Sequence, residues 1–157
     1  MKQISVLVLL SLLSSSLATP LLAVDGKKAQ YIGGTVSAIP ENAEGPIATN
    51  LEDKIVFTHK KGVWEVLYSQ VTGLEYGQKA GRRVGVAIAI SPIALFSKKR
   101  KHYLTINYND AAGKPQAAVF EIGKDIIRTT LTILETRSGK EIEYQDEEAR
   151  KAGRGSD

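Results

Sequence analysis

The stretch that decides the fold is Leu104-Thr105-Ile106-Asn107-Tyr108, followed by Asn109-Asp110-Ala111-Ala112-Gly113 and, after Lys114 to Ala117, by Ala118-Val119-Phe120-Glu121-Ile122. Large apolar residues alternate with polar or small ones on both sides of a turn-rich segment. Alternation with a period of two is typical of a strand with one buried face, and two such strands around a turn predict an antiparallel hairpin. The chain is therefore expected to be mainly β.

An earlier hairpin is predicted by the same pattern. Residues 55–59 and 64–68 alternate between apolar and polar types, and Lys60-Lys61-Gly62 forms the turn between them. Single strands are expected at 31–39, 71–76 and 84–90, and an irregular acidic loop at 41–53. A bulge or bend is expected at Gly73, because Val71 is out of step with the apolar residues that follow. The prediction thus contains seven strands.

The hydrophobic period changes from two to that of a helix after the second hairpin. Apolar or small residues recur at three- and four-residue spacing at Ile126, Ile127, Thr130, Leu131 and Leu134. Asp125 stands where an N-cap is expected and Gly139 where a helix usually ends. One amphipathic helix is therefore predicted near 124–138.

The C-terminal segment is predicted to contribute little to the core. Ile142 and Tyr144 indicate a short extended piece beside the helix. From 145 to 157, seven of the thirteen residues are charged and none is large and apolar. Such a composition predicts a mostly disordered tail that is helical at most near its start.

The order of seven strands followed by one helix resembles the pleckstrin-homology-like barrel, and within it the membrane-associated GRAM branch. The resemblance covers about residues 29–139 and includes Trp64-Glu65-Val66-Leu67-Tyr68-Ser69-Gln70-Val71-Thr72-Gly73-Leu74-Glu75-Tyr76. It implies a half-open barrel capped by the helix, and a scaffold that binds lipids, peptides or proteins without catalysis. The phosphoinositide binders of that family usually carry basic residues between the first two strands. Here that loop is acidic, with Glu41, Glu44, Glu52 and Asp53.

The N-terminus is predicted to be a cleavable signal peptide over residues 1–23. Lys2 precedes an apolar and serine-rich run, and small residues follow at Ala18 and Ala23. Cleavage after either alanine fits, and Ala23 is favoured. An uncleaved anchor is the alternative, but serines and Pro20 interrupt a run that is already short for a span of roughly 20 apolar residues. The protein is therefore expected in the periplasm or outside the cell.

Residues 24–144 are expected to form one domain. Their number suits a single hydrophobic core. The chain contains no cysteine, which excludes disulfides, thiolate metal sites and a lipid-modified cysteine. The core alone must hold such a domain together.

The charges of the chain are unevenly distributed. The whole chain carries a net charge of +4, yet no acidic residue lies between Glu75 and Asp110. That interval contains the predicted anion-binding residues Arg82, Arg83, Lys98, Lys99, Arg100, Lys101 and His102, together with Lys79. A basic block of this kind suits an anionic membrane surface, at about 1 kcal/mol per cation near the lipid.

An apolar run lies inside this basic block, from Val84 to Phe96. It is too short to cross a bilayer as a helix. It fits a wedge that dips into a membrane interface, with contacts from Ile90, Ile93, Leu95 and Phe96. The alternative is a buried strand that ends at Pro92 and is followed by a solvated lysine loop that discourages edge pairing. Both interpretations remain open at this point.

Catalysis is not predicted. His59 and His102 are the only histidines, and neither is at metal-ligand spacing from another ligand. His102 lies beside cations that lower its proton affinity, which suits a phosphate contact better than a metal. No cofactor is expected, and nucleic acid is an unfavourable partner for an exported chain.

The sequence therefore predicts a non-catalytic, exported binding module that contacts an envelope membrane or partner through segment 82–102. The alternative is an adaptor that binds a protein or peptide at the barrel edge or in a groove beside the helix. A small hydrolytic enzyme is a third and more remote hypothesis, because distant carboxylates can converge in a fold.

Overall fold

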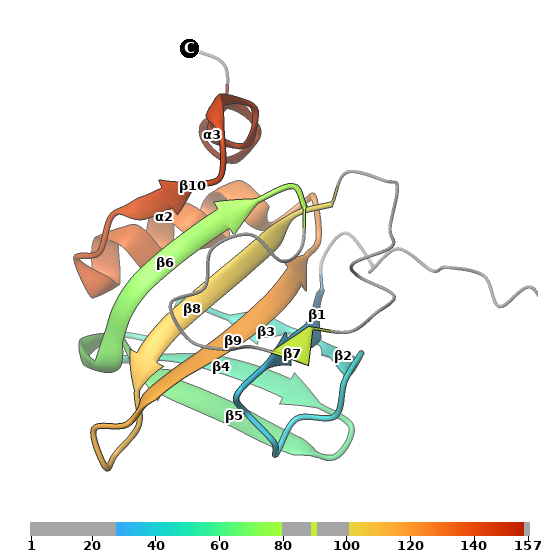
Figure 1. Ribbon diagram of the computed structural model, residues 1–157, viewed down its shortest axis with the longest axis vertical. Helices are drawn as coiled ribbons and strands as arrows, with labels where there is room; N and C mark the ends of the chain where they lie inside the picture. Colours follow the sequence, from blue (N-terminus) through green and yellow to red (C-terminus); the bar gives the residue numbers. More distant parts are fainter. Residues whose placement is uncertain (1–27, 80–88, 91–100, 156–157) are drawn as a thin grey trace, which may run out of the picture.

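The computed structural model describes residues 28–79, 89–90 and 101–155, which form two β-sheets with helices at the C-terminal end (Figure 1). The larger sheet has the order β10 (Ile142–Tyr144), β6 (Val71–Gly77), β8 (Tyr103–Asn109), β9 (Pro115–Ile122), β1 (Ala29–Gly34) and β2 (Glu44–Gly45), and β7 (Ala89–Ile90) also pairs with β1. The smaller sheet has the order β3 (Ile47–Ala48), β4 (Lys54–His59) and β5 (Gly62–Leu67).

Both predicted hairpins are confirmed. Strands β8 and β9 pair from Tyr103–Glu121 to Asn109–Pro115, and β4 pairs with β5 around Lys60 and Lys61. The carboxylate of Asp110 accepts hydrogen bonds from the backbone N–H groups of two residues in the β8–β9 turn. Apolar alternation and turn chemistry agree at these two places, which is why the pattern predicted them correctly.

Aromatic side chains join the two sheets into one core. The Phe120 ring of β9 lies 5.0 Å from Phe57 of β4 and 5.4 Å from Trp64 of β5, measured between ring centroids. Trp64 also meets Tyr108 of β8 edge-on, and its indole N–H donates to the Tyr108 hydroxyl at 3.4 Å. These contacts explain why the inward residues of both hairpins are buried.

The N-terminal part of the described chain departs from the prediction. A strand was expected over 31–39, but β1 ends at Gly34. Gly34 has a positive φ of 143°, and a Cβ there would lie 2.2 Å from the carbonyl oxygen of Ala117, so only glycine fits. The loop predicted for 41–53 contains the short strands β2 and β3. The alternating pattern is too short in both to be recognised.

The predicted bulge in β6 is confirmed, because its pairing register with β8 shifts between Val71 and Gly73. A short 3-10 helix, η1 (Tyr68–Gln70), separates β5 from β6. The strand predicted to continue through Tyr68 therefore ends one residue earlier. The Tyr68 hydroxyl turns inward and donates to the Thr49 carbonyl oxygen at 2.5 Å.

Helix α2 (Ile127–Ser138) contributes Ile127, Leu131 and Leu134 to the core and is close to the predicted range. Gly139 ends it in the left-handed conformation, as predicted, with φ at 65°. The predicted N-cap is wrong: Ile126 occupies that position and no side chain caps the helix. Asp125 is instead exposed in the turn before it.

The prediction of a mostly disordered tail from 145 onward is wrong. Helix α3 (Glu147–Arg154) occupies most of that segment. The short extended piece predicted at Ile142 and Tyr144 is confirmed, because β10 lies there and pairs in parallel with β6. Asp146 caps α3 by accepting a hydrogen bond from the backbone N–H of Ala149, and Ala149 is fully buried. Charged residues dominate the composition of this segment, but one face of α3 is made of small residues that pack closely on the domain.

The expected fold class, mainly β with a C-terminal helix, is confirmed. The sheets do not close on each other, which leaves strand edges at the rim of the smaller sheet. The described part of the chain contains ten strands where seven were predicted, and several are only two or three residues long. Of the strand predicted at 84–90, the structure describes only β7.

Candidate functional site

Most of the predicted membrane-contact segment lies outside the described residues. This applies to Arg82, Arg83, Ile93, Leu95, Phe96, Lys98, Lys99 and Arg100. Of Ile90, the structure describes the backbone, which pairs in β7 with Gly33 of β1. The remaining two predicted contacts, Lys101 and His102, are described with their side chains.

Lys101 forms an ion pair within the domain. Its Nζ lies 2.8 Å from Oε2 of Glu121 on β9, and the side chains are 13% and 4% exposed. A buried charge needs a partner of this kind, because removing either one would leave the other uncompensated. Because Lys101 is paired with Glu121, it is not free to bind an external anion.

His102 also faces the domain. Its ring stacks on Tyr76 with 6.0 Å between centroids, and its Nδ1 lies 2.5 Å from the Tyr76 hydroxyl. Burial lowers the pKa of His102, and the nearby Glu121 carboxylate opposes that shift. The prediction that the pKa of His102 is lowered therefore has the right direction. The cause differs, because burial lowers the pKa and not the neighbouring cations that were expected to do so. A neutral imidazole that accepts from Tyr76 fits this geometry.

The face of β8 that points away from the aromatic core is polar and partly buried. Tyr103 and Thr105 are 4% and 8% exposed, and the Asn107 amide donates to Glu75 Oε1 at 2.8 Å. Burial raises the pKa of Tyr103 to about 12, so its hydroxyl stays protonated. Strict alternation of polar and apolar residues is typical of a strand with one solvated face, so the sequence did not predict this burial.

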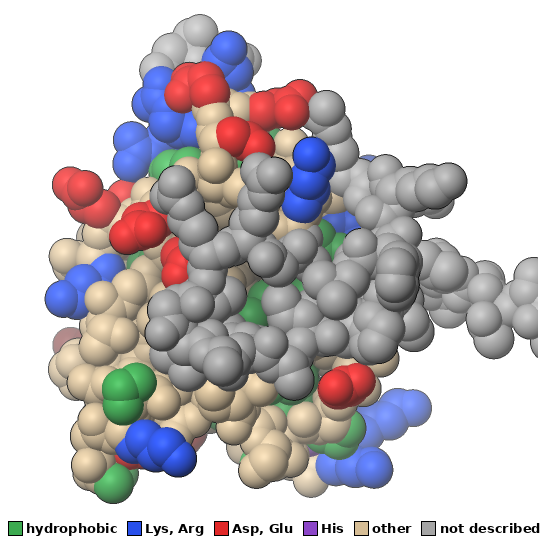
Figure 2. All heavy atoms as spheres, viewed as in Figure 1, with side chains coloured by type: hydrophobic (Ala, Val, Ile, Leu, Met, Phe, Trp, Pro, Cys, Tyr) green, Lys and Arg blue, Asp and Glu red, His purple; other side chains and the backbone are tan. Residues whose placement is uncertain are grey.

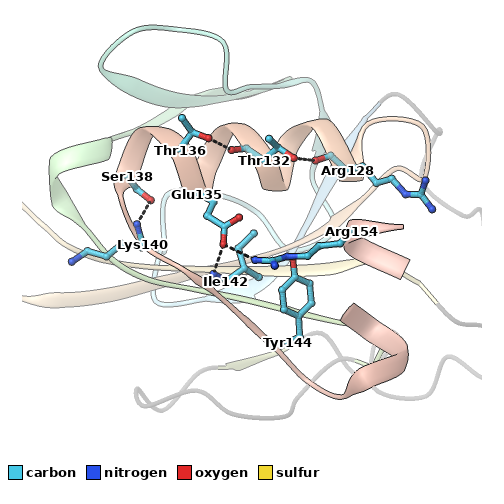
Figure 3. A network of polar contacts seen from close by, with 9 residues as sticks. All are labelled: Arg128, Thr132, Glu135, Thr136, Ser138, Lys140, Ile142, Tyr144 and Arg154. Carbon is cyan, nitrogen blue, oxygen red and sulfur yellow. Dashed lines mark hydrogen bonds and ion pairs between the residues drawn. The ribbon is translucent and has the colours of Figure 1, made fainter. Parts of the chain in front are cut away.

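The groove expected beside the helix is filled by the chain's own C-terminus (Figure 3). Glu135 Oε1 on α2 accepts from the backbone N–H of Ile142 at 3.3 Å and from Arg154 at 3.2 Å. The Arg154 guanidinium lies over the Tyr144 ring, 5.5 Å from its centroid, and donates to the Tyr144 hydroxyl. A partner in this groove would have to displace β10 and α3.

Positive and negative side chains lie side by side over α3 at the top of the space-filling view (Figure 2). Helix α3 carries Glu147 and Glu148 in its first turn and Lys151 and Arg154 in its last. Acidic residues near the N-terminus and basic residues near the C-terminus complement the helix dipole. This surface therefore has no single sign of charge that would attract a lipid headgroup or a nucleic acid.

Among the residues that the structure describes, strand β5 presents the clearest exposed apolar surface. Val63 is 60% exposed and Leu67 is 41% exposed, on the same face of the strand, with Glu65 between them. No strand other than β4 pairs with β5 within the described ranges, so its outer edge is open there. An open edge with apolar side chains is a template for another extended chain. The signal for this surface in the sequence is the presence of two apolar residues, Val63 and Leu67, at positions of the strand that face the solvent.

Two open hollows share Pro40. The first has a volume of about 340 Å³ and is lined by Pro40, Asn42, Ala43, Glu44, His59, Lys60 and Lys61. The second has a volume of about 370 Å³ and is lined by Tyr31, Gly33, Gly34, Thr35, Val36, Ser37, Ile39, Pro40 and Glu41. His59 stacks on Phe57, and its Nδ1 accepts from the backbone N–H of Lys61. These contacts account for the position of His59 without a ligand.

Within the described ranges, no three His, Cys, Asp or Glu side chains are grouped as metal ligands. No helix there is long and apolar enough to cross a bilayer. No protein-family model matches the chain, and no curated protein matches it. The case for a function therefore rests on the chain's own geometry.

Proposed function

We propose that this protein is a non-catalytic binding module that captures an extended segment of a partner polypeptide along the outer edge of β5. The observation that carries the proposal is the combination of an open strand edge with the exposed side chains of Val63 and Leu67. Backbone hydrogen bonds to an added strand supply affinity, and the side chains on alternate positions supply specificity. A pleckstrin-homology-like relationship and an envelope location are part of the same proposal.

A crosslinking experiment tests this proposal in the producing cell. A photoreactive amino acid at Leu67 is expected to form an adduct with a partner, whereas the same group at Thr129, on the exposed surface of α2, is not. Val63→Pro in the Leu67 probe should abolish the adduct, because proline removes a backbone donor at the edge. Equal adducts at both positions, or an adduct that survives Val63→Pro, would contradict edge capture.

A second candidate function is association with an anionic membrane surface through the basic block. It is favoured by the absence of acidic residues between Glu75 and Asp110 in the sequence. Because Lys101 is paired with Glu121, the variant to test neutralises Lys98, Lys99 and Arg100 and leaves Lys101 in place. Flotation with anionic vesicles at low salt should be lost in that variant. Flotation that is unchanged, or absent from the start, would exclude this candidate.

A further inference from the structure

The hydrogen bonds around β4 fix which backbone groups of β5 point outward. The Thr58 N–H donates to the Pro46 carbonyl oxygen at 3.1 Å, on the side of β4 away from β5. The Tyr68 N–H donates to the Asp53 carbonyl oxygen at 2.9 Å. In an antiparallel pair, bonded and non-bonded residue pairs alternate, so the N–H groups of residues 63, 65 and 67 point to the open edge.

The outward edge is short because one of these three donors is already used. The Leu67 N–H donates to Oε1 of Gln70 at 3.1 Å. Among the residues that the structure describes, no group accepts from the outward N–H of Val63 or Glu65, and the carbonyl groups of both residues point the same way. An added strand can therefore form ladder hydrogen bonds with β5 only beside Val63 and Glu65.

The side chains beside this edge define the chemistry of the partner. Val63, Glu65 and Leu67 are exposed on one face, with the carboxylate in the centre and an apolar group on each side. Glu65 Oε2 is 3.0 Å from Lys54 Nζ on the β4 side, and its side chain is still 56% exposed. A strand on the other side of β5 places its own side chains beside these three.

A second copy of the chain fits this edge poorly. If two β5 strands pair antiparallel with full overlap, Val63 faces Leu67 of the other copy and Glu65 faces Glu65. Like charges directly opposite each other destabilise a strand pair. Other registers leave one of the apolar residues opposite a charge or without a neighbour. With Val63 opposite Val63, Glu65 instead faces Lys61 of the other copy, but Leu67 then lies beyond the end of that copy's β5. A partner of a different sequence can match Glu65 and both apolar residues at once.

We infer that the partner segment at β5 has the pattern apolar–x–basic–x–apolar, with a lysine or arginine opposite Glu65 and apolar residues beside Val63 and Leu67. This inference rests on the proposed edge capture and specifies its partner. The basic residue extends the Lys54–Glu65 pair into a row of alternating charge across three strands. The two apolar residues cover side chains that are otherwise in contact with water.

Titration of the isotope-labelled protein with short peptides tests the pattern. The peptide TVTKTVT should shift the backbone amide signals of Val63 and Glu65 and bind about fivefold more tightly than TVTETVT, because the central contact changes from opposite to like charge. Glu65→Lys should reverse this preference. Glu143→Lys, at an exposed glutamate on β10, is the matched control and should leave it unchanged.

The outcomes separate the inference from the proposed function. Equal binding of both peptides at the β5 amides would overturn the inference that a basic residue lies opposite Glu65, and would leave the proposed edge capture in place. Absence of any shift at Val63 and Glu65 with either peptide would overturn edge capture itself. A concentration-dependent dimer that perturbs the same amides without peptide would show that a second copy is the partner and would also overturn the pattern.

Discussion

The β10 side of the larger sheet and the β5 side of the smaller one end in opposite ways. On the first side, β10 pairs with β6, and the Gln145 N–H continues the pairing to the Tyr76 carbonyl oxygen at 2.9 Å. Helix α3 then packs beside these strands, with Gly153 facing Tyr76 and Tyr144. Strand β5 has no such cover within the described residues, and two apolar side chains are exposed on it.

The difference shows where the chain protects itself from unwanted pairing and where it does not. Open edges invite association, and folded proteins usually cover, charge or shorten them. The β10 side is covered by two consecutive elements of the chain, β10 and α3. At β5, the Glu65 carboxylate and the hydrogen bond from the Leu67 N–H to Gln70 limit pairing at the edge without covering it. Under the proposed function, this remaining opening is where the partner segment binds.

The largest expected contrast between the two sides comes from shortening one side chain on each. Tyr76→Ala should lower the free energy of unfolding by about 3–5 kcal/mol, because this ring is 1% exposed and contacts both His102 and Tyr144. Val63→Ala, at a 60% exposed position, should change it by less than about 0.5 kcal/mol. Urea unfolding measures both. Similar losses for the two variants would show that the Val63 side chain is packed in the fold and is not free for a partner.

A smaller effect is expected where α3 meets the sheet. A Cβ on Gly153 would lie 2.8 Å from a ring carbon of Tyr144 and 3.0 Å from a methyl carbon of Leu131. Gly153→Val should therefore push α3 away and cost about 1–3 kcal/mol. Hydrogen exchange of the Gln145 amide should become faster in this variant.

The matched control for this prediction is Lys151→Val, which introduces the same β-branched residue at an exposed position of α3. It should leave the exchange of the Gln145 amide close to that of the unmodified protein. If both variants accelerate exchange equally, helix propensity and not packing holds α3 in place.

The covered side was also the part of the fold that the sequence predicted least well. Hairpins β4–β5 and β8–β9 were predictable because large apolar residues alternate along them and turn residues separate them. Helix α3 was not, because its buried contacts are made by Ala149 and Gly153, which carry almost no hydrophobic signal. The large apolar surface in that contact belongs to Tyr76, Leu131 and Tyr144, which come earlier in the chain.

The candidate site was only partly predictable for a related reason. Charge counting placed Lys101 in a basic block, but its partner Glu121 lies twenty residues away and becomes adjacent only when β9 pairs with β8. The exposed apolar side chains of β5 have a more direct signal in the sequence. Val63 and Leu67 occupy the outward phase of a strand whose inward residues, Trp64 and Val66, are also apolar, so the strand cannot bury all four on one face.

The smallest expected effect is a dependence of stability on pH that arises beside Tyr76. Burial lowers the pKa of His102 in the folded protein, so below about pH 6.5 the unfolded chain takes up a proton that the folded chain does not. The contribution of His102 is complete above pH 6.5 and is lost as the pH falls from there toward its folded pKa. The carboxylates of Asp110 and Glu147 have lowered pKa values and lose their contributions only at lower pH.

Urea unfolding between pH 7.5 and 5.5 therefore tests the contribution of His102. The free energy of unfolding should fall as the pH is lowered across that interval. His102→Gln keeps a group that can accept from the Tyr76 hydroxyl and removes the titration, so its stability should be nearly constant there. A slope that persists in His102→Gln would assign the dependence to another group. A flat profile in the unmodified protein would mean that His102 remains solvated, and that the covered side of the molecule opens more readily than its contacts imply.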